Sequence, residues 1–180
     1  MIKKKKKTSI IISSCTRNSK YLLEGKVLAI DPSSGSEDSQ PGFASYEEGQ
    51  LKELGTIEIG SKYQRKSLGN RLFHLHSYLL NEFDRPDILV IERCPFAYAN
   101  NAAAKLQQAT GCIKSVWDVP IIEVSPASWK RWIGDCEKLL GFPYVKSDDI
   151  DAAMLGLCCI SLAAGLEPEN STKRGKKVRK

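Results

Sequence analysis

Four carboxylates stand where apolar runs begin or end, and they are Asp31, Glu92, Asp148 and Asp151. The first two directly follow the apolar runs 27–30 and 88–91, which predict buried strands. The last two begin a segment rich in alanine and leucine, which predicts a helix. A charge at the tip of a buried strand is costly unless it is paired or bound to a metal. If the segments converge, the carboxylates outnumber the one adjacent cation, Arg93, and this imbalance favours divalent-metal and phosphodiester chemistry.

The spacing of the last two carboxylates places them on one face of the expected helix, where the helix dipole favours negative charge. Together the four carboxylates are expected to hold two Mg²⁺ ions, with Mn²⁺ as a substitute, because magnesium takes oxygen ligands from a few carboxylates. Two such ions activate water and stabilise a leaving 3′ oxygen. Simpler roles are helix capping for the helical pair and an Asp-Pro turn for Asp31. Asp149 is an alternative ligand that points about 100° away from Asp148.

Basic and aromatic side chains alternate in Trp129-Lys130-Arg131-Trp132. This pattern is typical of a surface that grips phosphates. The alternative is that both tryptophans pack inside while the two cations are solvated. Lys105, in an expected alanine-rich helix, could face either DNA or solvent.

Hydrophobic periodicity and turn residues predict an alternating order of elements. Strands are expected at 26–31, 42–46, 51–59, 87–92 and 121–124, and helices at 67–83, 100–117, 125–132 and 147–164. The turn 47–50 makes a hairpin of the second and third strands, and 32–41 forms a loop. This order predicts an α/β fold with a mixed five-stranded sheet and helices on both faces. Helical crossovers return strands parallel, so the first and fourth strands should be neighbours.

The 180 residues suit one domain with tails. The net charge is +6, but Lys and Arg concentrate at the two ends and leave the middle acidic. We therefore expect a basic, flexible N-terminal extension at 1–25, a folded domain at 26–165 and a basic C-terminal tail at 166–180. No core residue is expected before Lys26. The tails could attract a polyanion, serve only as solubilising ends, or act as a nuclear localisation signal.

The six cysteines include no Cys-x-x-Cys pair, and no histidine stands at zinc-ligand spacing, which argues against zinc and for a reducing interior. No apolar stretch approaches the roughly 18 residues of a membrane-spanning helix, and the apolar run after the first lysines is too short for a signal peptide. No membrane association is expected.

Four segments in this order resemble the RuvC family of Holliday junction resolvases, which has a ribonuclease H-like fold. They are Ala-Ile-Asp-Pro-Ser-Ser at 29–34, Ile-Glu-Arg-Cys-Pro-Phe-Ala at 91–97, the helix 100–111 with its Asn-Ala start and closing Gly, and Asp-Asp-Ile-Asp-Ala-Ala at 148–153. The resemblance covers roughly residues 26–165, nearly the whole expected domain. Each motif alone is weak, whereas all of them in order and on the expected elements are specific.

The resemblance implies a crossover junction endodeoxyribonuclease acting in DNA recombination and repair, with the four carboxylates as catalytic metal ligands. It places Lys130 and Lys138 near lysines that the family uses in catalysis or DNA binding, so we expect Lys138 to be catalytic. The expected DNA-binding residues are Phe96, Lys105, Lys130 and Arg131. The expected partners are four-way or branched DNA and a second copy of the chain, in the cytoplasm of a bacterial or phage-infected cell. The chain resembles the phage-type members of this family.

The apolar face of the helix 100–117 could be either core or a dimer interface, and its members are Ala102, Leu106, Ala109 and Ile113. Three departures from the family pattern affect the rim of the site. The loop 32–41 is longer than the usual turn, and Pro95 moves Phe96 one place later than the family's stacking aromatic. The segment after Trp132 leads almost directly to the last helix, where the family carries another helix.

Three functions follow as hypotheses. The first is a metal-dependent endonuclease that resolves branched DNA. The second keeps the fold and the site but acts on RNA, forks or other nucleic acids. The third is a non-catalytic nucleic-acid-binding module, which the intact carboxylate quartet argues against, because clustered charges are costly to maintain without a use.

Overall fold

The computed structural model describes residues 11–33, 40–59, 67–94 and 101–168. Its strands form one five-stranded sheet in the order β3-β2-β1-β4-β5. Their bounds are β1 Lys26–Asp31, β2 Gly42–Glu47, β3 Gln50–Thr56, β4 Ile88–Glu92 and β5 Ile121–Val124. The β1–β2 and β2–β3 pairs are antiparallel, and the β1–β4 and β4–β5 pairs are parallel. The predicted mixed sheet, with the first and fourth strands side by side, is confirmed.

The hairpin of β2 and β3 turns through Glu48 and Gly49, which have φ values of 52° and 74°. A two-residue turn with positive φ at both positions matches the twist of the flanking strands, and glycine adopts it without steric cost. The third strand ends at Thr56, before the predicted end at residue 59. The apolar residues Ile57 and Ile59 that extended the prediction are buried beside the sheet without belonging to it.

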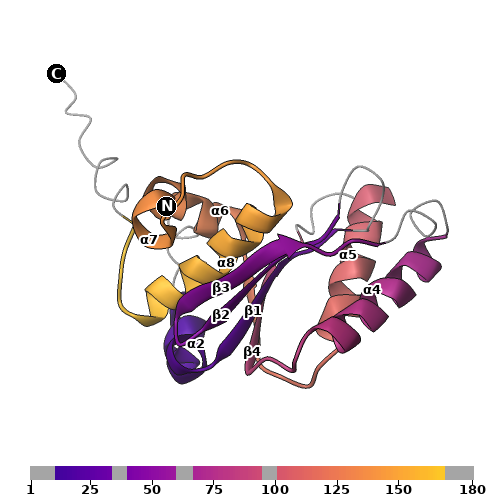
Figure 1. Cartoon of the computed structure of the whole chain (residues 1–180), viewed down its shortest axis with the longest axis horizontal. Helices are drawn as coiled ribbons and strands as arrows, with labels where there is room; N and C mark the ends of the chain where they lie inside the picture. Colours follow the sequence, from indigo (N-terminus) through magenta and orange to yellow (C-terminus); the bar gives the residue numbers. More distant parts are fainter. Residues whose placement is uncertain (1–10, 34–39, 60–66, 95–100, 169–180) are drawn as a thin grey trace, which may run out of the picture.

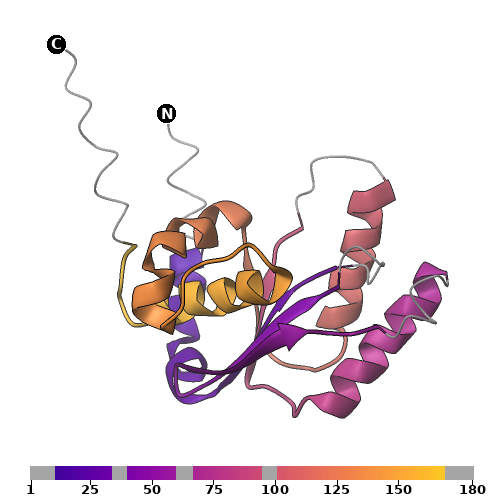
Figure 2. The same ribbon diagram turned by 45° about the horizontal axis from the view of Figure 1, so that its top comes forward.

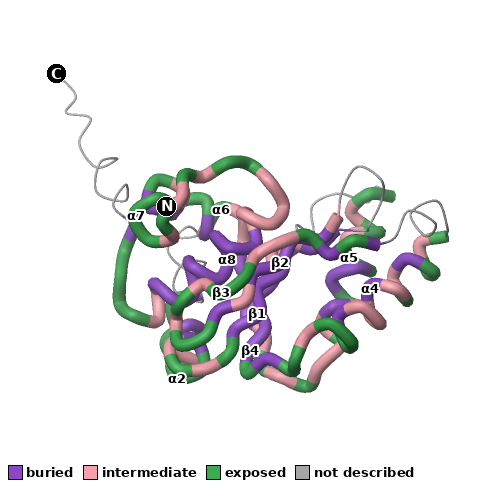
Figure 3. Tube along the Cα trace, in the orientation of Figure 1, coloured by how far each residue is buried: buried purple, intermediate pink, exposed green. Residues whose placement is uncertain are grey.

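Helices cover both faces of the sheet, as predicted (Figures 1 and 2). One face carries α4 Leu68–Glu82 and α5 Asn101–Lys114, and the other carries α2 Ser19–Glu24, α6 Pro126–Trp129 and α8 Asp148–Ala163. Alternate residues of β1 serve the two cores: Val27 and Ala29 pack on the α8 side, whereas Leu28 and Ile30 pack on the α4 side. The middle of β1 (27–30), most of β4 (88–91) and the middle of α8 (152–161) are buried without interruption (Figure 3).

Residues 11–24 are helical except for a turn at Asn18, and they contribute to the core. Ile11, Cys15 and Leu22 are buried in the same cluster as α8. The expectation that no core residue precedes Lys26 is therefore wrong for this segment. Its apolar residues recur at helical spacing, but the neighbouring lysine run obscured that period. Residues 1–10 and 169–180 of the predicted extension and tail lie outside the described residues.

The segment from Pro126 to Leu140 differs from the single helix predicted at 125–132. The α-helix α6 has only four residues and continues as the 3₁₀-helix η1 Lys130–Asp135 and the short helix α7 Cys136–Leu140. In a 3₁₀-helix, side chains three apart lie on the same side. This winding helps to bury both Trp129 and Trp132. The short segment after Trp132 thus contains a helix of its own.

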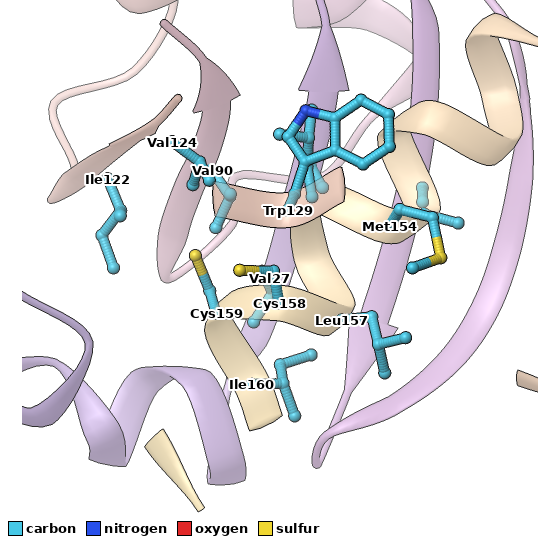
Figure 4. Close-up of a cluster of buried hydrophobic side chains, with 14 of the residues drawn as sticks. Val27, Val90, Ile122, Val124, Trp129, Met154, Leu157, Cys158, Cys159 and Ile160 are labelled. Carbon is cyan, nitrogen blue, oxygen red and sulfur yellow. The ribbon is translucent and has the colours of Figure 1, made fainter. Parts of the chain in front are cut away.

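Six free cysteines are present, and Cys158 and Cys159 of α8 pack among apolar side chains (Figure 4). Among the described helices, none combines the length and the apolar character needed to cross a bilayer.

Candidate active site

Asp31 and Glu92 end neighbouring parallel strands and face the same side of the sheet. The register pairs Ile30 with Ile91, so the two carboxylates come next in line at the carboxyl ends of β1 and β4. Side chains alternate along a strand, and the residues two places earlier, Ala29 and Val90, pack on the α8 side. The side chains of Asp31 and Glu92 therefore lie on the α8 side, where they are hydrogen-bonded to each other.

The first turn of α8 reaches these strand ends because Gly42 has no side chain. Gly42 is the β2 residue paired with Asp31. A Cβ at this position would overlap the backbone carbonyl of Asp148 and lie 2.6 Å from the backbone nitrogen of Asp149. This close approach brings Asp148 and Asp151 near enough to Asp31 for their charges to raise its pKa. The four predicted carboxylates thus gather at one end of the sheet.

The electrostatics of this cluster are dominated by burial and like charge. Burial, together with the hydrogen bond and charge of Glu92 and the charges of Asp151 and Asp148, raises the pKa of Asp31 to about 9. Burial also raises the pKa of Asp148, the charges of Asp151 and Asp149 add to this effect, and Lys146 opposes it. At neutral pH and without a bound cation, Asp31 therefore keeps its proton and donates it in the hydrogen bond to Glu92.

Arg93, the cation expected beside the carboxylates, is engaged by Glu123. Its Nε lies 3.4 Å from Oε2 of Glu123, and Nζ of Lys114 binds Oε1 of the same carboxylate. Glu123 follows the alternation of Ile121, which packs against the α4 side of the sheet, opposite to α8. The hydrogen bond and charge of Lys114, and then those of Arg93, hold the pKa of Glu123 below its ordinary value. Arg93 thus serves an ion pair of β5.

The donor set of the cluster suits a hard divalent cation, because it consists of carboxylate oxygens in excess of nearby positive charge. Nevertheless, no three Asp, Glu, His or Cys side chains of the described ranges stand close enough together to enclose an ion. In the absence of a cation, the raised pKa of Asp31 keeps this carboxyl protonated at neutral pH. A bound cation would replace that proton, and the residues therefore fit the expected metal in chemistry and charge.

The sequence did not predict two side chains that donate hydrogen bonds to the carboxylate cluster. The hydroxyl of Tyr144 donates to Oδ1 of Asp151 at 2.7 Å, and Nε1 of Trp129 donates to Oε1 of Glu92 at 3.4 Å. Burial and then the hydrogen bond and charge of Asp151 raise the pKa of Tyr144, so its hydroxyl stays a donor at neutral pH. The sequence predicts a phosphate-binding surface at Trp129, and no periodicity marks Tyr144. A residue that only donates a hydrogen bond to a site residue need not stand at any regular spacing from it, so the sequence does not reveal it.

The basic and aromatic residues after β5 divide into core and surface. Trp129 and Trp132 are buried, whereas Lys130 and Arg131 are exposed. Both tryptophans thus pack inside and both cations meet solvent, and the phosphate-binding role of the two cations stays a prediction. Nζ of Lys130 lies 5.1 Å from the ring centroid of Trp129, within the range of a cation–π interaction.

The remaining predicted residues lie on other elements. Lys138 is exposed on α7 and Lys105 is exposed on α5, whereas Phe96 lies outside the described residues. The predicted apolar face of α5 is split, because Ala109 and Ile113 are buried in the core while Ala102 is exposed. The roles of Lys105 and Lys138 stay predictions.

The fold is similar to solved structures of RuvC from Thermus thermophilus. One of them, RuvC in complex with a Holliday junction substrate, matches with a TM-score of 0.62 and 18% sequence identity, over 78% of this chain and 96% of that chain. A second T. thermophilus RuvC structure matches with a TM-score of 0.60 at the same identity and coverage. No protein-family model and no curated protein matches the chain. The predicted resemblance is therefore confirmed at the level of structure: the chain has the ribonuclease H-like fold of RuvC.

Proposed function

We propose that this protein is a divalent-metal-dependent endonuclease that cleaves four-way or otherwise branched DNA. The observation that carries the proposal is the gathering of four carboxylates from β1, β4 and α8 at one end of the sheet, on the fold of RuvC. Uncompensated charge of this kind destabilises a folded protein. A cation that binds there would remove this destabilisation, and the cluster is therefore best explained as a cation site.

Asp31, Glu92, Asp148 and Asp151 would hold Mg²⁺, or Mn²⁺ in its place. The metal would supply Lewis-acid stabilisation of the scissile phosphodiester and its leaving 3′ oxygen. The chain's own contribution is placement. The strand ends fix Asp31 and Glu92, Gly42 admits the first turn of α8, and Asp31 would hold the metal as the deprotonated carboxylate. In-line hydrolysis of one strand would follow with the phosphate held against this end of the sheet.

Exposed cations would bind the DNA backbone, and they are Lys105, Lys130, Arg131 and Lys138. Contacts between such cations and phosphates bind DNA without reading its sequence, which suits recognition of a branched shape. We also propose a catalytic role for Lys138 and a DNA-binding role for Phe96, which lies outside the described residues.

Cleavage of two opposed strands of a junction needs two sites related by a two-fold axis, and we propose a homodimer for this reason. The outer face of α4 and the exposed start of α5 offer apolar surface for it. Phe73 and Leu80 are 67% and 48% exposed, and they stand seven residues apart on the same side of α4. The proposed setting is DNA recombination or repair in the cytoplasm of a bacterial or phage-infected cell.

The test is cleavage of a labelled four-way junction with Mg²⁺, beside linear duplex, flap and RNA substrates. Asp31→Asn and Glu92→Gln remove one carboxylate each, and Asp84→Asn removes an exposed acid at the opposite end of the sheet as the matched control. We expect paired, symmetric nicks in the junction, lost with the first two variants while junction binding persists, and unchanged with the third. Cleavage of flap or RNA instead of the junction would refute the proposed substrate and leave the proposed catalytic site standing. Binding without any cleavage would refute the catalytic proposal.

A further inference from the structure

We propose that Tyr144 and Trp129 are positioning residues, which orient the carboxylates of Asp151 and Glu92 for a divalent cation. This inference rests on the proposed function, because it takes the carboxylate cluster as a cation site. It goes beyond that function by assigning roles to two residues that do not themselves ligate the ion.

Tyr144 holds one oxygen of Asp151 in a defined place. Its hydroxyl donates to Oδ1 at 2.7 Å, while its ring packs partly buried against the core on the α8 side. Packing fixes the ring, and the fixed ring fixes the hydroxyl. A carboxylate accepts bonds at both oxygens, so the bond to Oδ1 leaves Oδ2 open to a cation and restricts rotation of the group.

Trp129 makes the corresponding contact with Glu92. Its side chain is fully buried, and Nε1 lies 3.4 Å from Oε1 of Glu92. Figure 4 shows the indole nitrogen on the side of the ring away from Cys158, Cys159 and Ile160. An indole N–H donates only, so it neither ligates a metal nor takes up a proton. Orientation of the Glu92 carboxylate is the chemical role left to it.

Both donors come from the connection between β5 and α8, whereas their acceptors belong to β4 and α8. This connection therefore donates hydrogen bonds both to the strand-end carboxylate of Glu92 and to the helical carboxylate of Asp151. Hydrogen-bond partners of metal ligands orient them, and loss of such a partner typically weakens metal binding by about 10- to 100-fold. The alternative is a purely structural role, which would alter stability and leave ion affinity unchanged.

The sharper test is Tyr144→Phe, which removes the hydroxyl and keeps the ring. Mn²⁺ affinity is measured by titration calorimetry on the full chain, and the midpoint of thermal unfolding is measured in EDTA. We expect about 10-fold weaker Mn²⁺ binding with a nearly unchanged midpoint in EDTA. Tyr21→Phe is the matched control, since this tyrosine is 44% exposed on α2, and its variant should bind Mn²⁺ as the parent does.

Trp129 provides a second readout that does not depend on activity. Addition of Ca²⁺ should change the intrinsic fluorescence of the protein, because the ion alters the charge next to the indole ring. The change should vanish in Trp129→Phe and persist in Trp117→Phe, which removes a tryptophan packed on the α4 side of the sheet. If Trp129→Phe keeps the full change, the assignment of Trp129 is wrong.

The outcomes separate this inference from the proposed function. Tyr144→Phe with parental Mn²⁺ affinity, in a protein that cuts junctions, would overturn the inference and leave the function standing. Weaker Mn²⁺ binding by Tyr144→Phe, in a protein that cuts no nucleic acid, would support the inference and sink the function. A parent protein that binds no divalent ion would refute both.

Discussion

Acidic side chains gather at both ends of β1. At its amino end, Nζ of Lys26 lies 3.3 Å from Oδ2 of Asp84 and 4.0 Å from Oε1 of Glu47, and the side chains are half or more exposed. The Lys26 backbone nitrogen also donates to Oδ2 of Asp87 at 2.8 Å. At the carboxyl end, Asp31 is hydrogen-bonded to another carboxylate, and burial raises its pKa to about 9.

The difference shows that acidic composition alone does not mark a functional site. Exposed carboxylates beside a lysine cost the fold little, and such pairs contribute little to stability. Carboxylates that are withdrawn from water and placed against one another do cost the fold, unless a cation joins them. This contrast supports the proposal that the carboxyl end of β1, and not its amino end, binds a cation.

The largest expected effect comes from Gly42→Ala, which would disrupt the packing of α8 at the carboxyl end of β1 and leave the amino end intact. The added Cβ overlaps backbone of α8 at Asp148, and backbone cannot move aside as a flexible side chain does. We expect a loss of about 3 kcal/mol or more in the free energy of unfolding, at the upper end for overpacked sites. Divalent-ion binding should fall with it, because the first turn of α8 is displaced from Asp31.

Gly69→Ala is the control for this substitution. Gly69 lies in α4, where a Cβ meets nothing within 4 Å, and alanine favours a helix more than glycine does. Urea unfolding should show this variant to be as stable as the parent or more so. A Gly42→Ala protein with parental stability and ion binding would mean that α8 does not depend on this approach.

The close approach of α8 to Gly42 could not be predicted from the sequence. The four carboxylates could be predicted, because each borders an apolar run and the order of elements places the first and fourth strands together. The glycine that admits α8 could not, since it stands at the start of a strand like any turn residue. Contacts between distant segments decide such a role, and no local period reports them.

The predictions for the N-terminal segment and for Arg93 were wrong for related reasons. Residues 11–24 contribute Ile11, Cys15 and Leu22 to the core, but the lysines before them dominate the local composition. Arg93 adjoins Glu92 in the sequence, yet successive side chains of an extended segment point to opposite faces, and Arg93 pairs with Glu123. Adjacency along the chain is a poor guide to which charges compensate one another.

The second prediction concerns the pH dependence of the metal-free protein. The pKa of Asp31 is raised from 3.8 to about 9 on folding, so the folded state binds more protons than the unfolded state between these values. The contribution of Asp31 to the stability of the folded state should therefore be greatest in acid and fall as the pH rises toward 9. Asp31→Asn carries no titrating group here and should lose less stability over the same range.

Thermal unfolding in EDTA across this pH range measures the difference, and adding Mg²⁺ should restore the parent most at the alkaline end. Asp84→Asn is the matched control, because it removes an acid from the other end of β1 and should retain the slope of the parent. Equal slopes for the parent and Asp31→Asn would show that burial does not perturb Asp31.

The smallest expected effect belongs to the amino end of β1. The Asp84 side chain is 88% exposed, and its contact with Lys26 at 3.3 Å is open to water and salt. Asp84→Asn should lower the free energy of unfolding by less than about 1 kcal/mol, and the loss should shrink further in about 1 M salt, where the Debye length is near 3 Å. Urea unfolding at low and high salt measures both. A larger, salt-independent loss would mean that the amino end also holds charges withdrawn from water, and the contrast between the two ends of β1 would then no longer identify the site.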